Sequence, residues 1–174
     1  MLLLSFSIAL LSVLRHVGAF PFSDDGEDRK VATLEDDDFA AAARPLCRDA
    51  AERVTATVVS APATDLVALA DEIEAEQVIV RKLRRELDEA SDSVGEADQV
   101  LVADWLENWD TIDSVRRRYI IALRAAAGTG GGAVELAALA DDADIAWADL
   151  ERFAQANGLA ACVLDDVALR TPPQ

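Results

Sequence analysis

The chain has 174 residues, which is long enough for one domain with a substantial core but short for two. Hydrophobic residues make up 52% of it and aromatic residues only 5%, and the abundance of Ala, Leu and Val favours helices packed on helices over an all-β fold. Its formal net charge is −17, from 33 Asp and Glu against 16 Lys and Arg, which disfavours binding to nucleic acid or to an anionic lipid surface.

An apolar segment, Met1 to Leu14, opens the chain and fits two interpretations. It has the length of a signal-peptide core, and Val17-Gly18-Ala19 offers small residues for a cleavage site. Against a signal peptide, no positive charge precedes the segment, whereas Arg15 follows it. Residues 1–22 would form a helix about 33 Å long, enough to span a bilayer. We therefore expect a membrane anchor at residues 1–22 with the domain outside the cytoplasm; a cleaved signal, and hence a secreted protein, is the alternative.

Residues 23–38 are rich in acidic side chains, as in Asp24-Asp25-Gly26-Glu27-Asp28 and Glu35-Asp36-Asp37-Asp38. This composition predicts a solvated linker between the membrane and the folded domain. The spaced ligands and terminal Glu of a calcium-binding loop are missing, so no metal site is expected here. We expect the folded domain to occupy residues 39–168 and a tail to follow at residues 169–174.

The first predicted helix follows this linker. Asp38 can cap a helix that runs to about Val59. Pro45 either lies within its early turns and bends it, or marks its true start. Pro62 ends this element, and Asp65 opens the next one.

The next two helices are predicted to form an antiparallel hairpin. Between Leu66 and Val94, hydrophobic residues recur at the a and d positions of a heptad, and only Glu76 interrupts them. Gly95 marks a turn, after which a helix from Ala97 to Ala127 has a broad apolar face. The members of that face are Leu101, Val102, Trp105, Leu106, Trp109, Ile112, Tyr119, Ile120 and Leu123.

Charged residues on the two helices form complementary blocks across this hairpin. We expect Arg116, Arg117 and Arg118 to lie near Asp71, Glu72 and Glu74. We also expect Arg81, Lys82, Arg84 and Arg85 to lie beside Asp104 and Glu107. Such complementarity supports antiparallel neighbours joined by a short turn, although exposed pairs contribute only about 0–1 kcal/mol each.

The rest of the domain is predicted to be helical as well. Gly128 to Gly132 is interpreted as a flexible connection, because it lacks the Lys-Ser or Lys-Thr ending of a phosphate-binding loop and follows a helix. A short helix at 133–140 and a longer one at 142–156 should follow. Gly158 then ends the last helix in the left-handed conformation. The expected buried set of the last helix is Ile145, Trp147, Leu150, Phe153 and Ala154.

The two cysteines are Cys47, in the first predicted helix, and Cys162, in a segment expected to be extended. Cysteines of an exported chain are usually paired, because no reducing system protects their thiols there. A Cys47–Cys162 disulfide would close a loop of about 115 residues and contribute roughly 4–5 kcal/mol in the chain-entropy description. It would bring the two ends of the domain together.

The scarcity of histidine excludes many chemistries. His16, in the apolar leader, is the only histidine, so the domain cannot assemble a Ser-His-Asp or Cys-His set or a zinc site with imidazole ligands. Carboxylates are abundant, but nothing in the sequence distinguishes a buried or perturbed pair. The sequence therefore predicts neither a metal nor a cofactor.

Three short segments carry a resemblance: Ala42 to Cys47, Ala103 to Trp109 followed by Arg116 to Tyr119, and Phe153 to Cys162. In combination they resemble a group of small uncharacterised actinobacterial proteins with an N-terminal membrane helix and an extracytoplasmic helical domain. The resemblance covers residues 39–168. The chain differs at Leu159, where the group often has Met. The resemblance implies a location and a fold, but no activity.

Together these observations predict an all-α antiparallel bundle of about four helices, closed by one disulfide. The favoured function is a non-enzymatic interaction or scaffold domain of the cell envelope, bound to the membrane through its N-terminal segment and, through its helical surface, to an envelope protein. A binding protein for an apolar ligand is the first alternative, with Trp105, Trp109 and Tyr119 as candidate interaction or ligand face; those residues also fit an ordinary core. A carboxylate-dependent hydrolase is the second alternative.

Overall fold

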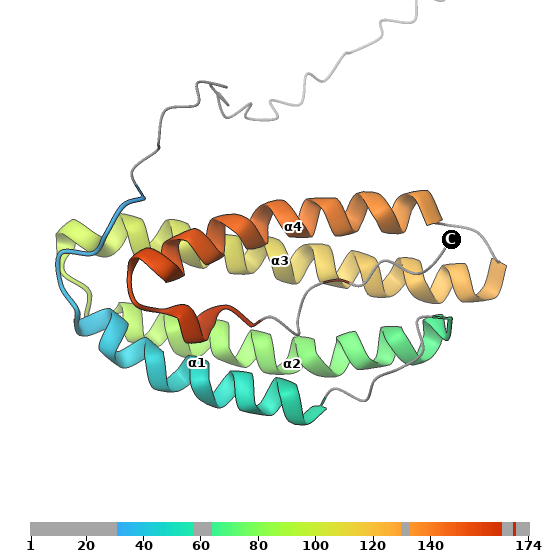
Figure 1. Ribbon diagram of the computed structural model, residues 1–174, viewed down its shortest axis with the longest axis horizontal. Coiled ribbons are helices and arrows are strands. Elements are labelled where there is room, and N and C mark those ends of the chain that lie inside the picture. Colours follow the sequence, from blue (N-terminus) through green and yellow to red (C-terminus); the bar gives the residue numbers. More distant parts are fainter. Residues whose placement is uncertain (1–30, 58–63, 130–132, 165–168, 170–174) are drawn as a thin grey trace, which may run out of the picture. The chain divides into compact units, whose positions relative to one another are not determined.

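The described part of the chain folds into four α-helices and one short 3-10 helix. The computed structural model describes residues 31–57, 64–129, 133–164 and 169. The helices are α1 (Asp38–Thr57), α2 (Leu66–Ser91), α3 (Glu96–Thr129), α4 (Ala133–Ala156) and η1 (Ala160–Cys162). Successive α-helices run antiparallel and pack on one another in chain order, and η1 packs on both α1 and α4 (Figure 1). No strand occurs in these described ranges, so the predicted all-α bundle is confirmed.

The α2–α3 hairpin is built as its sequence predicts. The Asp65 carboxylate accepts a hydrogen bond of 3.0 Å from the backbone N–H of Ala68 and caps α2. The chain then turns through Gly95, whose carbonyl accepts a hydrogen bond of 3.0 Å from the N–H of Asp98. Only four residues separate α2 from α3, so the two helices lie side by side as an antiparallel pair.

The charge blocks of the hairpin meet in a different register from the predicted one. Arg124, rather than the Arg triplet, contacts Asp71 and Glu74, at 2.7 Å each. Arg81 and Arg84 contact Asp113 and Asp110 in place of Asp104 and Glu107. The prediction placed acidic and basic residues near each other along the two helices, but not in the right pairs. Two side chains meet only if they also point into the same groove, and that depends on the rotation of each helix about its axis.

α1 is more regular, and α4 longer, than the sequence suggested. α1 passes through Pro45 without interruption, so this proline is not the start of the helix. α4 is one helix, not two, because an apolar stripe on the α3 side runs past Asp141 and Asp142 without a break. Ile145, expected to be buried, is 63% exposed because it points away from this stripe. The buried stripe consists of Leu136, Leu139, Ala140, Ala143, Ala146, Leu150, Phe153 and Ala154.

Buried hydrophobic side chains form two separate clusters along the bundle. The first, here called the stapled end, joins α1, the second half of α2, the first half of α3, the second half of α4, and η1; it holds Phe39, Cys47, Leu83, Trp105, Trp109, Leu150, Phe153 and Cys162 among others. The second, here called the three-helix end, contains no residue of α1; it holds Leu69, Ile73, Tyr119, Leu123, Leu136, Leu139 and Leu169 among others. Beyond the end of α1, the core is therefore lined by α2, α3, α4 and the buried Leu169.

The segment before α1 belongs to the folded domain. The carboxylate of Asp98, itself buried, accepts hydrogen bonds of 3.0–3.1 Å from the backbone N–H groups of Glu35 and Asp36. The amide of Asn157 accepts from the N–H of Leu34 and donates to the carbonyl of Ala32. The predicted solvated linker, residues 23–38, is therefore fixed to the bundle over its last part, and the compact unit begins at Val31.

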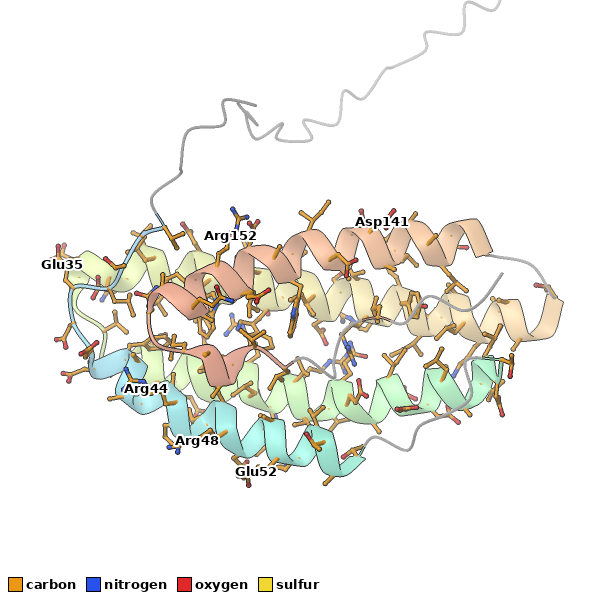
Figure 2. All side chains as sticks on the ribbon, viewed as in Figure 1. Glu35, Arg44, Arg48, Glu52, Asp141 and Arg152 are labelled. Atoms are coloured by element: carbon orange, nitrogen blue, oxygen red, sulfur yellow. A yellow bond between two sulfur atoms is a disulfide. The ribbon has the colours of Figure 1, made fainter. Side chains whose placement is uncertain are left out.

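The predicted anchor or signal segment, residues 1–22, lies outside the described residues. Of the helices in the described ranges, none carries an apolar stretch long enough to cross a bilayer. The outer surfaces of these helices are charged, as the labelled Arg48 and Glu52 on α1 and Asp141 and Arg152 on α4 illustrate (Figure 2).

Candidate functional site

The disulfide joins the first helix to the turn after the last one. Cys47 of α1 and Cys162 of η1 are bonded, with their Cα atoms 4.7 Å apart and 115 positions apart in sequence. Both side chains are fully buried. The predicted bridge and the meeting of the two ends of the domain are confirmed, although Cys162 lies in a 3-10 turn and not in an extended tail. Because η1 packs on both α1 and α4, the bridge closes the bundle.

The chain reverses into η1 through Gly158. This glycine has φ of +66°, a left-handed conformation that favours glycine, as predicted. Its carbonyl accepts a hydrogen bond of 3.0 Å from Nε of Arg44, and a Cβ at this position would lie 3.2 Å from that guanidinium. Leu159 is fully buried directly after it. The reversal therefore places Cys162 within reach of α1.

Two of the three predicted aromatic site residues lie inside the stapled end. Trp105 stacks on Phe153 with ring centroids 5.3 Å apart and meets Phe39 and Trp109 edge-on at 6.0 Å each. Its indole Nε1 donates a hydrogen bond to the carbonyl of Leu150. Trp109 meets Trp147 edge-on at 6.1 Å. These rings fill space between helices, which is the geometry of an aromatic core.

The third aromatic residue, Tyr119, lies apart from the two tryptophans in the three-helix end. It is fully buried, and burial raises the pKa of its phenol to about 12. Trp105, Trp109 and Tyr119 therefore form neither a common face nor an exposed one, and none of them lines either of the two cavities described below. The interpretation of these residues as core is the one that the structure supports.

A buried ion pair lies in the α2–α3 interface, next to the three-helix end. Nη2 of Arg116 is 2.8 Å from Oε2 of Glu76, and the same nitrogen donates a hydrogen bond to the carbonyl of Ile73. Desolvation by burial lowers the pKa of Arg116, and the bond to Glu76 opposes that change. Glu76, the one interruption of the predicted heptad, thus has a buried partner. That partner is Arg116, the first residue of the Arg triplet, whose ion pairs were expected at the surface.

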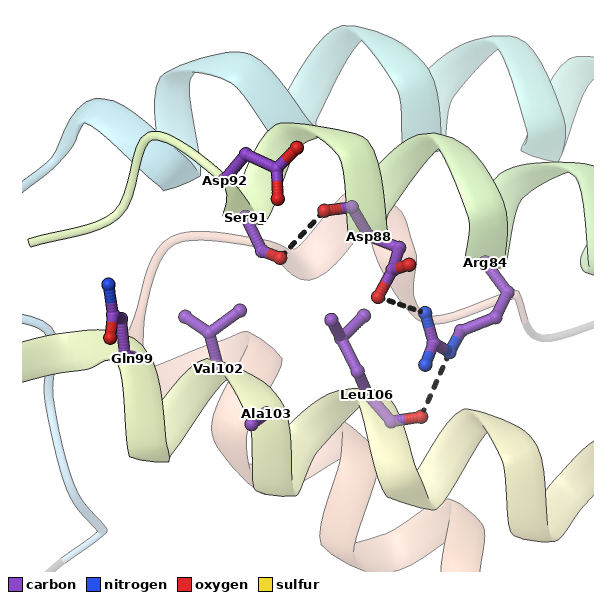
Figure 3. Close-up of a pocket in the computed structure, with 8 residues that line it drawn as sticks. All are labelled: Arg84, Asp88, Ser91, Asp92, Gln99, Val102, Ala103 and Leu106. Atoms are coloured by element: carbon purple, nitrogen blue, oxygen red, sulfur yellow. Dashed lines mark hydrogen bonds and ion pairs between the residues drawn. The ribbon is translucent and has the colours of Figure 1, made fainter.

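The larger of the two described cavities lies in the outer groove of the hairpin, near its turn (Figure 3). It has a volume of about 360 Å³, with Val102 and Leu106 at its floor. Arg84 spans it, bonding to the carbonyl of Leu106 and to the carboxylates of Asp88 and Asp110. Burial works against the charge of Arg84, but these two carboxylates outweigh it and raise the pKa of the guanidinium. Each of its three nitrogens therefore already donates a hydrogen bond.

The second cavity lies further along the same groove and has a volume of about 280 Å³. Gln77, buried at its floor, donates to both the carbonyl and the carboxylate of Asp113, which also pairs with Arg81 and Arg117. Two exposed aliphatic side chains, Val78 and Ile121, line it. Of the two cavities, only this one is lined by large exposed hydrophobic residues, one from each helix of the hairpin.

The described residues contain no group of three or more His, Cys, Asp or Glu that could hold a metal ion. Of the buried carboxylates, Glu76 is paired with Arg116 and Asp98 accepts backbone N–H groups. Neither of these carboxylates lines the two cavities. The clearest functional feature in the described ranges is therefore the groove of the hairpin with its mixed charges and its aliphatic pair.

The chain matches no protein-family profile, no curated protein and no solved structure with which it was compared.

Sequence reasoning missed two features of this surface. Val78 and Ile121 stand outside the predicted seams, and their position opposite each other depends on the register of the hairpin. The docking of residues 31–36 on Asp98 and Asn157 also escaped it, because backbone N–H donors leave no pattern in the sequence. The sequence did contain a signal for the buried Arg116–Glu76 ion pair. Glu76 is a lone acid in a hydrophobic seam, and such an acid usually has a buried partner.

Proposed function

We propose that this chain is a non-enzymatic interaction or scaffold domain of the cell envelope, attached to the membrane through residues 1–22. The observation that carries the proposal is the Cys47–Cys162 bond. Disulfides that define a fold form and persist in oxidising compartments and are rare in a reducing cytoplasm. A helical domain that depends on such a bond is suited to work outside the cytoplasm, whether anchored or secreted.

The character of the surface supports an interaction role. Trp105 and Trp109 are fully buried in the core and line neither of the two cavities described above. The groove between α2 and α3 is long and carries arginines and carboxylates that already bind each other. Such a mixed surface is typical of the rim of a protein interface, with Val78 and Ile121 as its apolar centre.

In-cell crosslinking with position-specific reagents tests this proposal. A photoreactive residue at Ile121 in the full chain should trap an envelope protein or another copy of this chain in intact cells, and the product should fractionate with the envelope. The matched control is Ile145, which is 63% exposed on α4, outside the groove. Equal trapping at both positions, or recovery of the full-length chain from the cytoplasm, would contradict the proposal.

A further inference from the structure

The second cavity of the groove is lined by one stripe of residues from each helix of the hairpin. On each helix the lining residues stand at positions i, i+3, i+4 and i+7, which share one face. On α2 they are Glu74, Gln77, Val78 and Arg81. On α3 they are Arg117, Ile120, Ile121 and Arg124. A chain with a formal net charge of −17 thus places three arginines around one cavity.

The charges of these arginines are balanced differently at the two ends of the cavity. At one end, Arg81 and Arg117 share a single carboxylate, that of Asp113, at 2.6 Å and 3.3 Å. At the other end, Arg124 alone contacts two carboxylates, at 2.7 Å each. The end with Arg81 and Arg117 therefore has one more guanidinium than carboxylate, whereas the end with Arg124 has one more carboxylate than guanidinium.

Arg81 and Arg117 also have nitrogens that can bind a further anion. Within the described ranges, Arg81 donates a hydrogen bond only through Nε, and Arg117 is held by its ion pair with Asp113 alone. Their side chains are 42% and 56% exposed, so solutes can reach them. Arg84 in the first cavity differs, because each of its three nitrogens already donates a hydrogen bond. A guanidinium with two free N–H groups suits a carboxylate, which it can bind through two parallel hydrogen bonds.

Branched aliphatic side chains line the same cavity. Val78 and Ile121 are 62% and 68% exposed, and the buried Ile120 contributes a third apolar surface. The volume of about 280 Å³ is close to the lower limit of ~300 Å³ for ordinary ligand sites. The cavity therefore suits a small ligand that carries both an anionic group and a few aliphatic carbon atoms.

We propose that this cavity binds a carboxylate joined to a short branched aliphatic group. The carboxylate bridges Arg81 and Arg117, and the aliphatic group packs on Val78 and Ile121. A bound carboxylate gives each of the two guanidinium groups a carboxylate of its own. A single extra positive charge suits a monoanion, whereas a phosphate group carries roughly two negative charges at neutral pH and would meet more repulsion in so acidic a chain.

This chemistry has two sources. One is the C-terminal leucine or valine of an envelope protein, and the other is a free branched-chain acid. The proposal rests on the role of the groove as a contact surface, and it adds the chemistry of the group that the groove binds.

Titration of the purified full chain in mild detergent at low salt, followed by NMR, tests the site. N-acetyl-leucine represents a C-terminal leucine, 3-methylbutanoate represents a free acid, and N-acetyl-leucinamide is the neutral control. We expect both acids to shift the methyl resonances of Val78 and Ile121 in a saturable way, and the amide to bind about tenfold more weakly. Tighter binding of N-acetyl-leucine than of 3-methylbutanoate supports a chain terminus as the ligand, and the reverse order supports a free acid. Equal affinity for N-acetyl-leucine and its amide would overturn the proposal.

A matched pair of arginine variants locates the bound carboxylate. Arg117→Gln should weaken the binding of N-acetyl-leucine about tenfold, because it removes one of the two guanidinium groups. Arg118→Gln is the control, since this neighbour is exposed, carries the same charge and does not line the cavity. It should change the affinity by less than about twofold. Both arginines are exposed, so both variants should fold. Equal weakening by the two variants would show that only the total charge matters, and would overturn the site.

Failure of this site is distinguishable from failure of the interaction role. If N-acetyl-leucine does not bind while a photoreactive residue at position 121 still traps an envelope protein in cells, only the carboxylate site is overturned. If the acid binds as expected but nothing is trapped in cells, the site stands and the interaction role is overturned.

Discussion

The two ends of the bundle bury their hydrophobic side chains in different ways. The stapled end packs the aromatic side chains of Phe39, Trp105, Trp109 and Phe153, with Trp147 partly buried against them, between helices that the disulfide ties together. The three-helix end has one aromatic ring and no disulfide, and alanines make up a larger share of its buried residues, five of 14 against five of 23 in the stapled end. Large rigid rings and a crosslink restrict adjustment, whereas small side chains and missing helix contacts allow it. The difference predicts unequal responses to the same kind of substitution.

Removing the disulfide should have the largest effect. Cys47→Ser combined with Cys162→Ser should lower the free energy of unfolding by about 4–5 kcal/mol, because the unfolded chain regains the freedom of a long loop. Denaturant unfolding with and without reductant measures this. The wild type under reducing conditions should resemble the double variant; a wild type that reductant does not destabilise would show that the stapled end holds without its bond.

Breaking the buried ion pair should rank second. Arg116→Ala leaves the Glu76 carboxylate buried without its cation and should cost about 3–5 kcal/mol. The neighbouring Arg117→Ala is the control, since Arg117 is exposed and its pair with Asp113 should contribute under about 1 kcal/mol. Urea unfolding of both variants gives the comparison, and similar losses would mean that Arg116 is solvated.

Substitution of one leucine in each end of α4 allows a direct comparison of how much stability each end loses. Leu150 lies in the stapled end and Leu139 in the three-helix end, and both are buried. We expect Leu150→Ala to cost about 4 kcal/mol and Leu139→Ala about 2–3 kcal/mol, because the smaller side chains around Leu139 can move into the space. The same unfolding experiment measures both values. A larger loss at Leu139 would reverse the proposed order of rigidity.

The smallest expected effect is the pH dependence of stability that arises from Tyr119, the only tyrosine of the chain. Its folded pKa, about 12, lies above the ordinary value of 10.0, so the folded state favours the neutral phenol. The resulting stability is fully present below pH 10 and is lost as the pH rises through about 12. Ultraviolet titration of the phenolate should give a higher midpoint in the native chain than in urea, and Tyr119→Phe should remove the transition. Equal midpoints would place the phenol in water.

Local patterns in the sequence predicted most of the fold. The heptad from Leu66 to Val94, with Gly95 after it, is sufficient to predict the hairpin, and two cysteines in a chain that is expected to be exported predict the bridge. The errors concern properties set by neighbours in space. Ile145 fitted an amphipathic pattern but points to solvent, since which face of α4 meets α3 depends on the whole stripe.

The candidate site was less predictable than the fold. Trp105, Trp109 and Tyr119 stood out because aromatic residues are rare here, yet rarity does not distinguish a core ring from a binding ring. Val78 and Ile121 gain significance only once the register of the hairpin places them together. A surface site formed by two helices can be predicted only when the register between them is known, and no short sequence motif specifies that register.

The central claim is that this domain exists in an oxidised, stapled form where it works. Its most direct test is alkylation of the native protein, isolated from cells without reductant and with free thiols blocked during lysis, then denatured and analysed by mass spectrometry. We predict no alkylated cysteine and one peptide pair that joins Cys47 to Cys162. Alkylation of both thiols would contradict the account, because the stapled end and the argument for an extracytoplasmic location both depend on this bond.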